Sequence, residues 1–159
     1  MPFIKNDLAQ FTNAPFKEGE GVDIYIDGAR FLPENATFSR VLMRGFTVDF
    51  IRVIDPVKGL CDLNLSTSRN PFYGFRYELR APKLDPTIII EVTVETIDRS
   101  DGLEKIIGYC YFPLFLNSQT MQQNTDRNQL GVTLQNGAYQ LPIYLDRLPQ
   151  NNNITNENM

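Results

Sequence analysis

Carboxylates are the side chains that could do chemistry in this sequence, because the chain contains no histidine. The usual general base, the Ser–His and Cys–His nucleophile pairs and most zinc sites require histidine. Glu91 and Glu95 share one face of a strand-like run, but a catalytic carboxylate pair needs a pocket and a raised pKa. We interpret the two residues as a solvated strand face, and the sequence has no glycine-rich phosphate loop. These features predict a protein that is not an enzyme.

An acidic loop, residues 98–105, holds three further carboxylates: Asp98, Asp101 and Glu104. Converging carboxylates are the ligands that calcium prefers, although calcium needs about six to eight oxygen atoms. The segments on both sides of the loop alternate apolar and polar residues, which is the pattern of strands with one buried face. We therefore expect two strands joined by this loop, and a core made by Ile90, Val92, Val94, Ile107, Cys110, Phe112 and Leu114.

Short strands are also predicted earlier in the chain. Residues 22–27 alternate cleanly. Residues 40–54 form a longer strand-like run, in which the alternation slips near Ile51 and indicates a bulge or bend. We expect residues 60–65 to form a short strand whose apolar face carries Cys61, Leu63 and Leu65.

Three later segments complete the expected set of strands. Residues 72–79 are rich in aromatic side chains, which favours a strand. Residues 130–134 and 139–145 flank Asn136-Gly137, a pair typical of the type I′ turn in a hairpin. About eight short strands without a convincing helix predict an all-β fold, an eight-stranded antiparallel β-sandwich, with a barrel as the alternative.

The chain length, 159 residues, suits one domain with one core. We expect an extended leader at residues 1–20, the sandwich at residues 21–147 and a disordered, Asn-rich tail at residues 148–159. No apolar run is long enough to cross a bilayer, and the first residues do not resemble a secretory signal.

Charge and cysteine content narrow the expected partners and location. The net charge is −4, the sequence pI is about 4.8, and lysines and arginines are scattered singly. This distribution argues against a nucleic-acid partner and against general attraction to anionic lipid. We interpret Cys61 and Cys110 as free, buried side chains, with a mutual disulfide or a reactive thiol as the alternatives. Reduced cysteines fit a cytoplasmic protein.

Four motifs, in their order along the chain, resemble those of a C2 domain. They are VDIYIDGARFLP at residues 22–33, Asn70-Pro71-Phe72-Tyr73, the run 90–98 followed by Ile107-Gly108, and residues 137–145. The resemblance covers residues 22–146. The phrases GARFLPENAT, NPFYGFRYELR and GAYQLPIYL look most similar to C2 domains in coiled-coil proteins of cilia and basal bodies. This likeness implies a non-catalytic scaffold domain of a larger cytoskeletal or ciliary protein.

The resemblance also implies where calcium ligands would lie, because calcium-dependent C2 domains use aspartates from their loops. Here Glu34 and Asn35 stand where the first aspartate is expected, and Thr96 stands at a later one. Asp98 matches the family's pattern. We therefore expect no metal cofactor, and we regard the following residues as weak calcium candidates only: Glu34, Asn35, Asp98, Asp101 and Glu104.

Two further features of the family bear on lipid. Three apolar residues near the first loop could insert into a membrane or could cap the core beneath it: Phe31, Leu32 and Phe38. Three arginines on the expected strands could form a small patch for phosphoinositide headgroups or could be ordinary surface residues: Arg40, Arg44 and Arg52. The first hypothesis is a protein-interaction domain, the alternative is membrane docking with weak or no calcium dependence, and self-association is a third.

Overall fold

The computed structural model describes residues 4–5, 16–17, 19–80 and 84–148, and this part of the chain is built from strands without a helix. Most of the expected leader and all but Leu148 of the expected tail lie outside the described residues. The described residues contain no helix that is long and apolar enough to cross a membrane. The strands are β1 (Ile4–Lys5), β2 (Val22–Gly28), β3 (Ser39–Phe46), β4 (Arg52–Leu60), β5 (Phe72–Leu79), β6 (Ile89–Ile97), β7 (Glu104–Pro113), β8 (Phe115–Asn117), β9 (Val132–Leu134) and β10 (Tyr139–Gln140).

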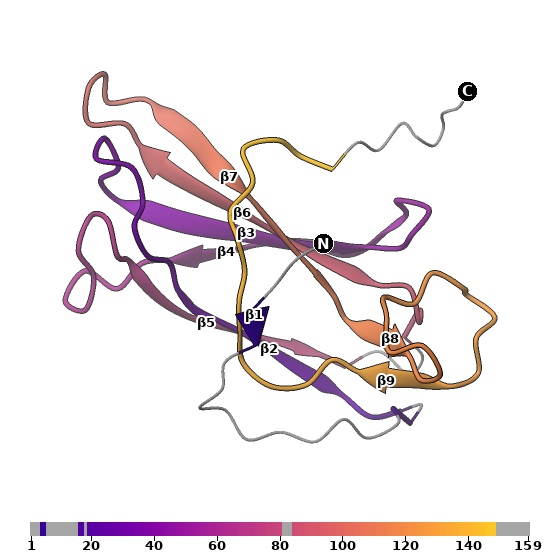
Figure 1. Ribbon diagram of the computed structural model, residues 1–159. Coiled ribbons are helices and arrows are strands. Elements are labelled where there is room, and N and C mark those ends of the chain that lie inside the picture. The colour runs from indigo at the N-terminus through magenta and orange to yellow at the C-terminus, as the bar shows by residue number, and fades with distance from the viewer. Residues whose placement is uncertain (1–3, 6–15, 18, 81–83, 149–159) are drawn as a thin grey trace, which may run out of the picture.

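The larger layer is an antiparallel sheet in the order β4-β3-β6-β7 (Figure 1). Val94 pairs with Val41 of β3 on one side and with Gly108 of β7 on the other. Strands β6 and β7 are therefore the two strands that the acidic loop was expected to join, which confirms that prediction. Side chains alternate between the two faces of this sheet, as they must in any strand.

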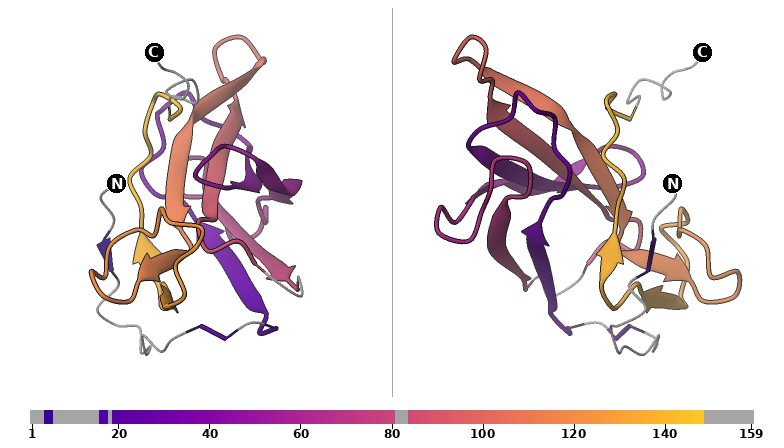
Figure 2. Two further views of the ribbon diagram at one scale, coloured as in Figure 1. Left: turned by 90° about the vertical axis from the view of Figure 1, so that its right-hand side faces the viewer. Right: turned by 60° about the vertical axis from the view of Figure 1, so that its left-hand side comes forward.

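The second layer contains β2 paired with β5, and two small pairs, β1 with β10 and β8 with β9 (Figures 1 and 2). Apolar side chains from both layers meet in a core that includes Val22, Met43, Ile54, Leu79, Ile90, Leu114 and Phe115. A second buried cluster, under the loops that follow β2 and β6, contains Leu32, Ala36, Val41, Tyr73 and Val94. The fold is thus an antiparallel β-sandwich, as the strand pattern predicted.

Residues 40–54 are two strands and a turn, which corrects the prediction of one long strand. The amide of Thr47 donates to the carbonyl oxygen of Ile51, and the amide of Ile51 donates to the Thr47 hydroxyl. Phe50 adopts a positive φ of 62°, which a strand does not allow. The slip in alternation near Ile51 marks this turn between β3 and β4.

Residues 61–65 form a turn, so the predicted strand at residues 60–65 is wrong. The Asp62 carboxylate accepts hydrogen bonds from the amides of Asn64 and Leu65, which closes the turn. Leu63 and Leu65 are consequently exposed, and Cys61 is only half-buried. Both cysteines are free, and Cys110 is buried as expected.

The Asn136-Gly137 pair does not close a hairpin, although its sequence is typical of one. Gly137 has a positive φ of 115°, so the chain does turn there. Strand β9 pairs with β8, however, and β10 pairs with β1. The turn therefore redirects the chain to a different pair of strands.

Candidate functional site at the loop end

Three connections meet at one end of the sandwich, which we call the loop end: residues 29–38, residues 61–71 and residues 98–103 (left side of Figure 1). They share this end because consecutive antiparallel strands reverse direction. The side chain of Asn70 accepts a hydrogen bond from the amide of Phe31, and the Nε of Arg69 donates to the carbonyl oxygen of Leu32. The amide of Arg99 donates to the carbonyl oxygen of Asn35. These bonds tie the first connection to the other two.

The Asp98 carboxylate is buried among donors from this chain. Its Oδ1 accepts hydrogen bonds from the hydroxyl and the amide of Ser100, at 2.6 and 2.8 Å. Its Oδ2 accepts one from Nδ2 of Asn35 at 2.8 Å and lies 3.3 Å from Nζ of Lys105. The Ser100 bonds, then that from Asn35, hold the pKa of Asp98 well below its usual value of 3.8. Both carboxylate oxygens are thus engaged by protein groups.

Lys105 places its ammonium group where the two loop aspartates come together. Its Nζ lies 2.7 Å from Oδ2 of Asp101 as well as 3.3 Å from Asp98. The hydrogen bond to Asp101, with the one to Asp98, raises the pKa of Lys105, and the same contact lowers the pKa of Asp101. A calcium ion would need these same oxygens. Within the described residues, no three His, Cys, Asp or Glu side chains are grouped as metal ligands.

The remaining calcium candidates do not join this group. Glu104 points to the other side of the sheet, where its Oε2 lies 3.0 Å from Nη2 of Arg40. Glu34 is exposed on the first connection. The Thr96 hydroxyl, at a position where the resemblance implies a ligand, donates to the carbonyl oxygen of Phe38 and accepts from the amide of Thr37. The structure therefore brings together only Asn35, Asp98 and Asp101 of the five candidates.

The three arginine candidates lie apart, and each is next to a carboxylate. Arg40 forms an ion pair with Glu95 at 2.6 Å, a contact that raises the pKa of the guanidinium. The Nε of Arg44 lies 3.3 Å from Glu91. Arg52, at the opposite end of the sheet from the loops, lies 3.5 Å from Asp55. Their positive charges are therefore matched within the chain and do not gather into one basic patch.

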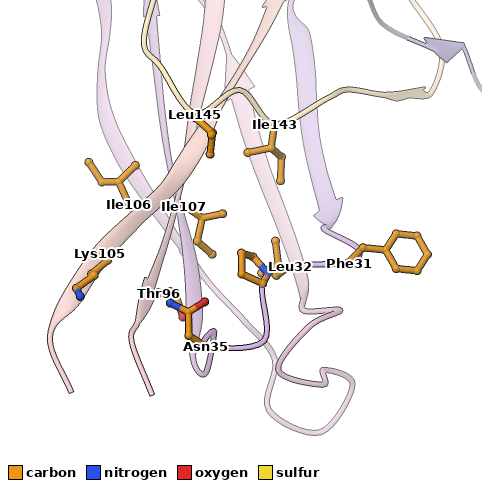
Figure 3. Close-up of a pocket in the computed structure, with 10 residues that line it drawn as sticks. Phe31, Leu32, Asn35, Thr96, Lys105, Ile106, Ile107, Ile143 and Leu145 are labelled. Carbon is orange, nitrogen blue, oxygen red and sulfur yellow. The ribbon is translucent and has the colours of Figure 1, made fainter. Parts of the chain in front are cut away.

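The apolar candidates separate into one buried residue and two exposed ones. Leu32 is 1% exposed and packs in the second core cluster, so it caps the core and offers no side chain to a lipid. Phe31 is 80% exposed, has a positive φ of 60°, and points away from the neighbouring side chains (Figure 3). Phe38 is 59% exposed at the entry to β3.

Sequence reasoning missed the wider apolar surface at this end. Its members are large side chains that are each more than half exposed, and we call them the loop-end surface: Phe31, Phe38, Leu60, Leu63, Leu103 and Ile106. The alternation of Leu63 with polar neighbours predicts a buried strand face, whereas the side chain is exposed. Its position after Asp62, a residue that favours turns, was the available signal for the exposed loop.

Two open depressions adjoin the loop-end surface on either side of Thr96, which lines both. One, of about 360 Å³, has Phe31, Ile106 and Leu145 among its lining residues (Figure 3). The other, of about 320 Å³, is lined by Phe38, Leu60, Leu63 and Ile97, with the Arg40–Glu95 ion pair beside them.

Comparisons with known proteins do not assign the chain to a family. No protein-family model and no curated protein matches the sequence. Among solved structures, the chain is similar to crystal structures of PLC21 from S. officinalis and L. pealei, with 15% and 16% sequence identity and a TM-score of 0.44 in both cases. The matches cover 82% and 80% of this chain and 16% of each of those chains.

Proposed function

We propose that this chain is a non-catalytic, C2-like interaction domain that binds a protein partner through the loop-end surface. The observation that carries the proposal is the presence of six large, exposed apolar side chains at one end of the sandwich, two of which line one depression and three the other. Single exposed apolar residues are normal on protein surfaces, but a rimmed group of them marks a surface that is covered in use.

The fixed position of the three connections supports this role. Hydrogen bonds join loops that are distant in sequence: Asn70 and Asp98 accept them, and Arg69 and Asn35 donate them. A surface that is already in its bound shape loses less conformational freedom when a partner docks. The loop end is therefore suited to binding without rearrangement.

The ion pairs of two loop-end cations weaken the case for a membrane partner. Lys105 is paired with Asp98 and Asp101, and Arg40 is paired with Glu95 and Glu104. Attraction to anionic lipid depends on clusters of unmatched lysine and arginine. With Lys105 and Arg40 paired in this way, the loop end would hold a bilayer mainly by apolar insertion, together with Arg69 and Arg99, whose guanidinium groups donate to carbonyl oxygens.

We place this activity in a larger cytoplasmic scaffold of the cytoskeleton, in a cilium or basal body. The support is the likeness of GARFLPENAT, NPFYGFRYELR and GAYQLPIYL to C2 domains of such coiled-coil proteins. Heptad repeats in the same polypeptide beside this domain would agree with that setting.

Quantitative affinity capture with matched variants tests the proposal. Wild type is compared with Phe31→Asn and Leu63→Gln, which alter exposed loop-end side chains, and with Tyr25→Gln, which alters an exposed side chain on β2. We expect a set of proteins that is depleted by both loop-end changes and retained by Tyr25→Gln. Equal capture by all four chains would refute the proposal, and so would loop-end-dependent sedimentation with anionic vesicles in place of protein binding.

A further inference from the structure

Residues 143–148, which we call the strap, start at the inner cluster with Ile143 and continue over part of the outer face of the four-stranded sheet, the face turned away from β2 and β5. The strap runs alongside β7 (left view of Figure 2). The amide of Tyr109 donates to the carbonyl oxygen of Tyr144 at 2.7 Å, and the amide of Tyr144 donates back to Tyr109 at 2.8 Å. This antiparallel bridge occupies part of the edge of β7.

Glu91 lies beneath the strap and is completely buried. The Arg147 guanidinium donates two hydrogen bonds to the Glu91 carboxylate, from Nε to Oε2 at 2.9 Å and from Nη2 to Oε1 at 2.8 Å. The Tyr111 hydroxyl donates to Oε2 and accepts from the amide of Leu148. The interpretation of Glu91 as a solvated residue is therefore wrong, because the strap covers it.

The surface under the strap is shaped to receive a peptide backbone. A Cβ atom on Gly108 would lie 2.4 Å from the carbonyl oxygen of Tyr144, so a larger residue at this position would force the strap away. The Arg147 guanidinium also lies over the ring of Tyr109, 5.8 Å from its centroid. Glu91 in turn requires a cation, since a buried carboxylate without a partner is costly.

The strap is anchored at its start and exposed at its end, because Ile143 and Tyr144 pack against buried clusters whereas the later residues do not. Leu145 is 83% exposed and Leu148 is 37% exposed, whereas Tyr111 beneath them is 2% exposed. Residues 145–148 bury few of their own apolar side chains, and such a segment can open without unfolding the rest of the domain.

We propose that the edge of β7 together with Glu91 is a docking site for an extended peptide segment with an arginine three residues after its pairing residue. The strap fills this site in the isolated chain, and a partner segment of the same pattern displaces it. Strand addition at a sheet edge supplies the backbone bonds, and the carboxylate selects the arginine. This site is separate from the loop-end surface and does not depend on it.

The test uses the full chain with Arg147→Met, which keeps an unbranched side chain but removes the guanidinium, and Arg76→Met as the control on β5. Amide hydrogen exchange should quicken at Tyr109 and Tyr144 in Arg147→Met, while Val41 and Val94 of the central strands stay as protected as in wild type. The control should exchange like wild type at all four amides.

A labelled peptide with the sequence of residues 141–148 then probes the opened site. It should bind Arg147→Met at least about tenfold more tightly than wild type, because a site filled by its own strap lowers the apparent affinity. The same peptide with methionine in place of its arginine should lose this binding. In wild type, excess peptide should quicken exchange at Tyr144 while Tyr109 stays protected by the incoming strand.

Three results would overturn the proposal. One is unchanged exchange at Tyr109 and Tyr144 in Arg147→Met, and another is equal peptide binding by the variant and wild type. The third applies even when Arg147→Met does not fold: a failure of excess peptide to release Tyr144 in the wild-type chain.

Discussion

The ammonium group of Lys105 lies 3.3 Å from Oδ2 of Asp98, the one loop residue that matches the calcium ligands of the resembled family. A cation from the chain itself is therefore already placed against that carboxylate. Asp101 shares the same lysine, so one cation of the chain contacts both loop aspartates. In the proposed function, the loop end acts through its apolar side chains and needs no metal to assemble it.

Calcium is expected to leave the stability of the domain unchanged. A ligand raises the melting temperature only if it binds the native state, and Lys105 competes for the oxygens that calcium would use. Thermal unfolding with and without about 1 mM calcium should give the same midpoint. A calcium-dependent rise that disappears in Asp98→Asn would contradict this account.

Asp98 should make stability depend on pH in the acid range. Because folding lowers its pKa below 3.8, its contribution is fully present above that pH and is lost as the pH falls towards the lower, folded pKa. Asp98→Asn should therefore have a lower free energy of unfolding than wild type near neutral pH. The difference between the two free energies should become smaller below pH 3.8. Urea unfolding of both chains at about pH 6 and about pH 3 measures the gap. A gap that stays constant would show that the carboxylate contributes nothing through its charge.

Replacing Glu91 by glutamine should destabilise the domain by about 3 kcal/mol, because it leaves Arg44 and Arg147 together without their buried counter-charge. Glu78→Gln is the control, since Glu78 is half exposed and pairs with Arg76 and Arg80 at the surface. That change should cost less than about 1 kcal/mol. If denaturant unfolding showed the same loss in free energy of unfolding for both variants, the buried ion pairs of Glu91 would not stabilise the domain as we expect.

Phe31→Asn should leave stability unchanged or raise it slightly. The residue has a φ of 60°, a left-handed conformation that asparagine tolerates better than phenylalanine, and its ring is 80% exposed. The variant therefore removes the aromatic ring from the loop end without damage to the core. A fall of more than about 1 kcal/mol in the free energy of unfolding would mean that the ring packs against the loops.

Local alternation predicted the centre of the fold because burial follows a period of two along a strand. Ile90, Val94, Cys110 and Leu114 are buried as the pattern indicated. The same rule failed at residues 47–51, because the apolar alternation of Phe46, Val48 and Phe50 continues through a turn.

The candidate site was harder to predict, since its contacts join residues far apart in the chain. Glu91 looked solvated because its cover, Arg147, comes from 56 residues later. Asn35 and Asp98 were both noted as calcium candidates, yet their hydrogen bond spans 63 residues. Only the contacts between residues close in sequence could be predicted from local patterns. These are the Asp98-Arg99-Ser100 turn and the Asp101–Lys105 ion pair.

Photo-crosslinking from the loop end tests the central claim most directly. Phe31 is replaced by photoreactive benzoylphenylalanine in the full chain, and Tyr25 on β2 is replaced in the same way as the control. Our account predicts defined protein adducts from position 31 that are absent from position 25. Identical adducts from both positions, or adducts from position 31 with lipid alone, would contradict the claim that this end of the sandwich binds a protein partner.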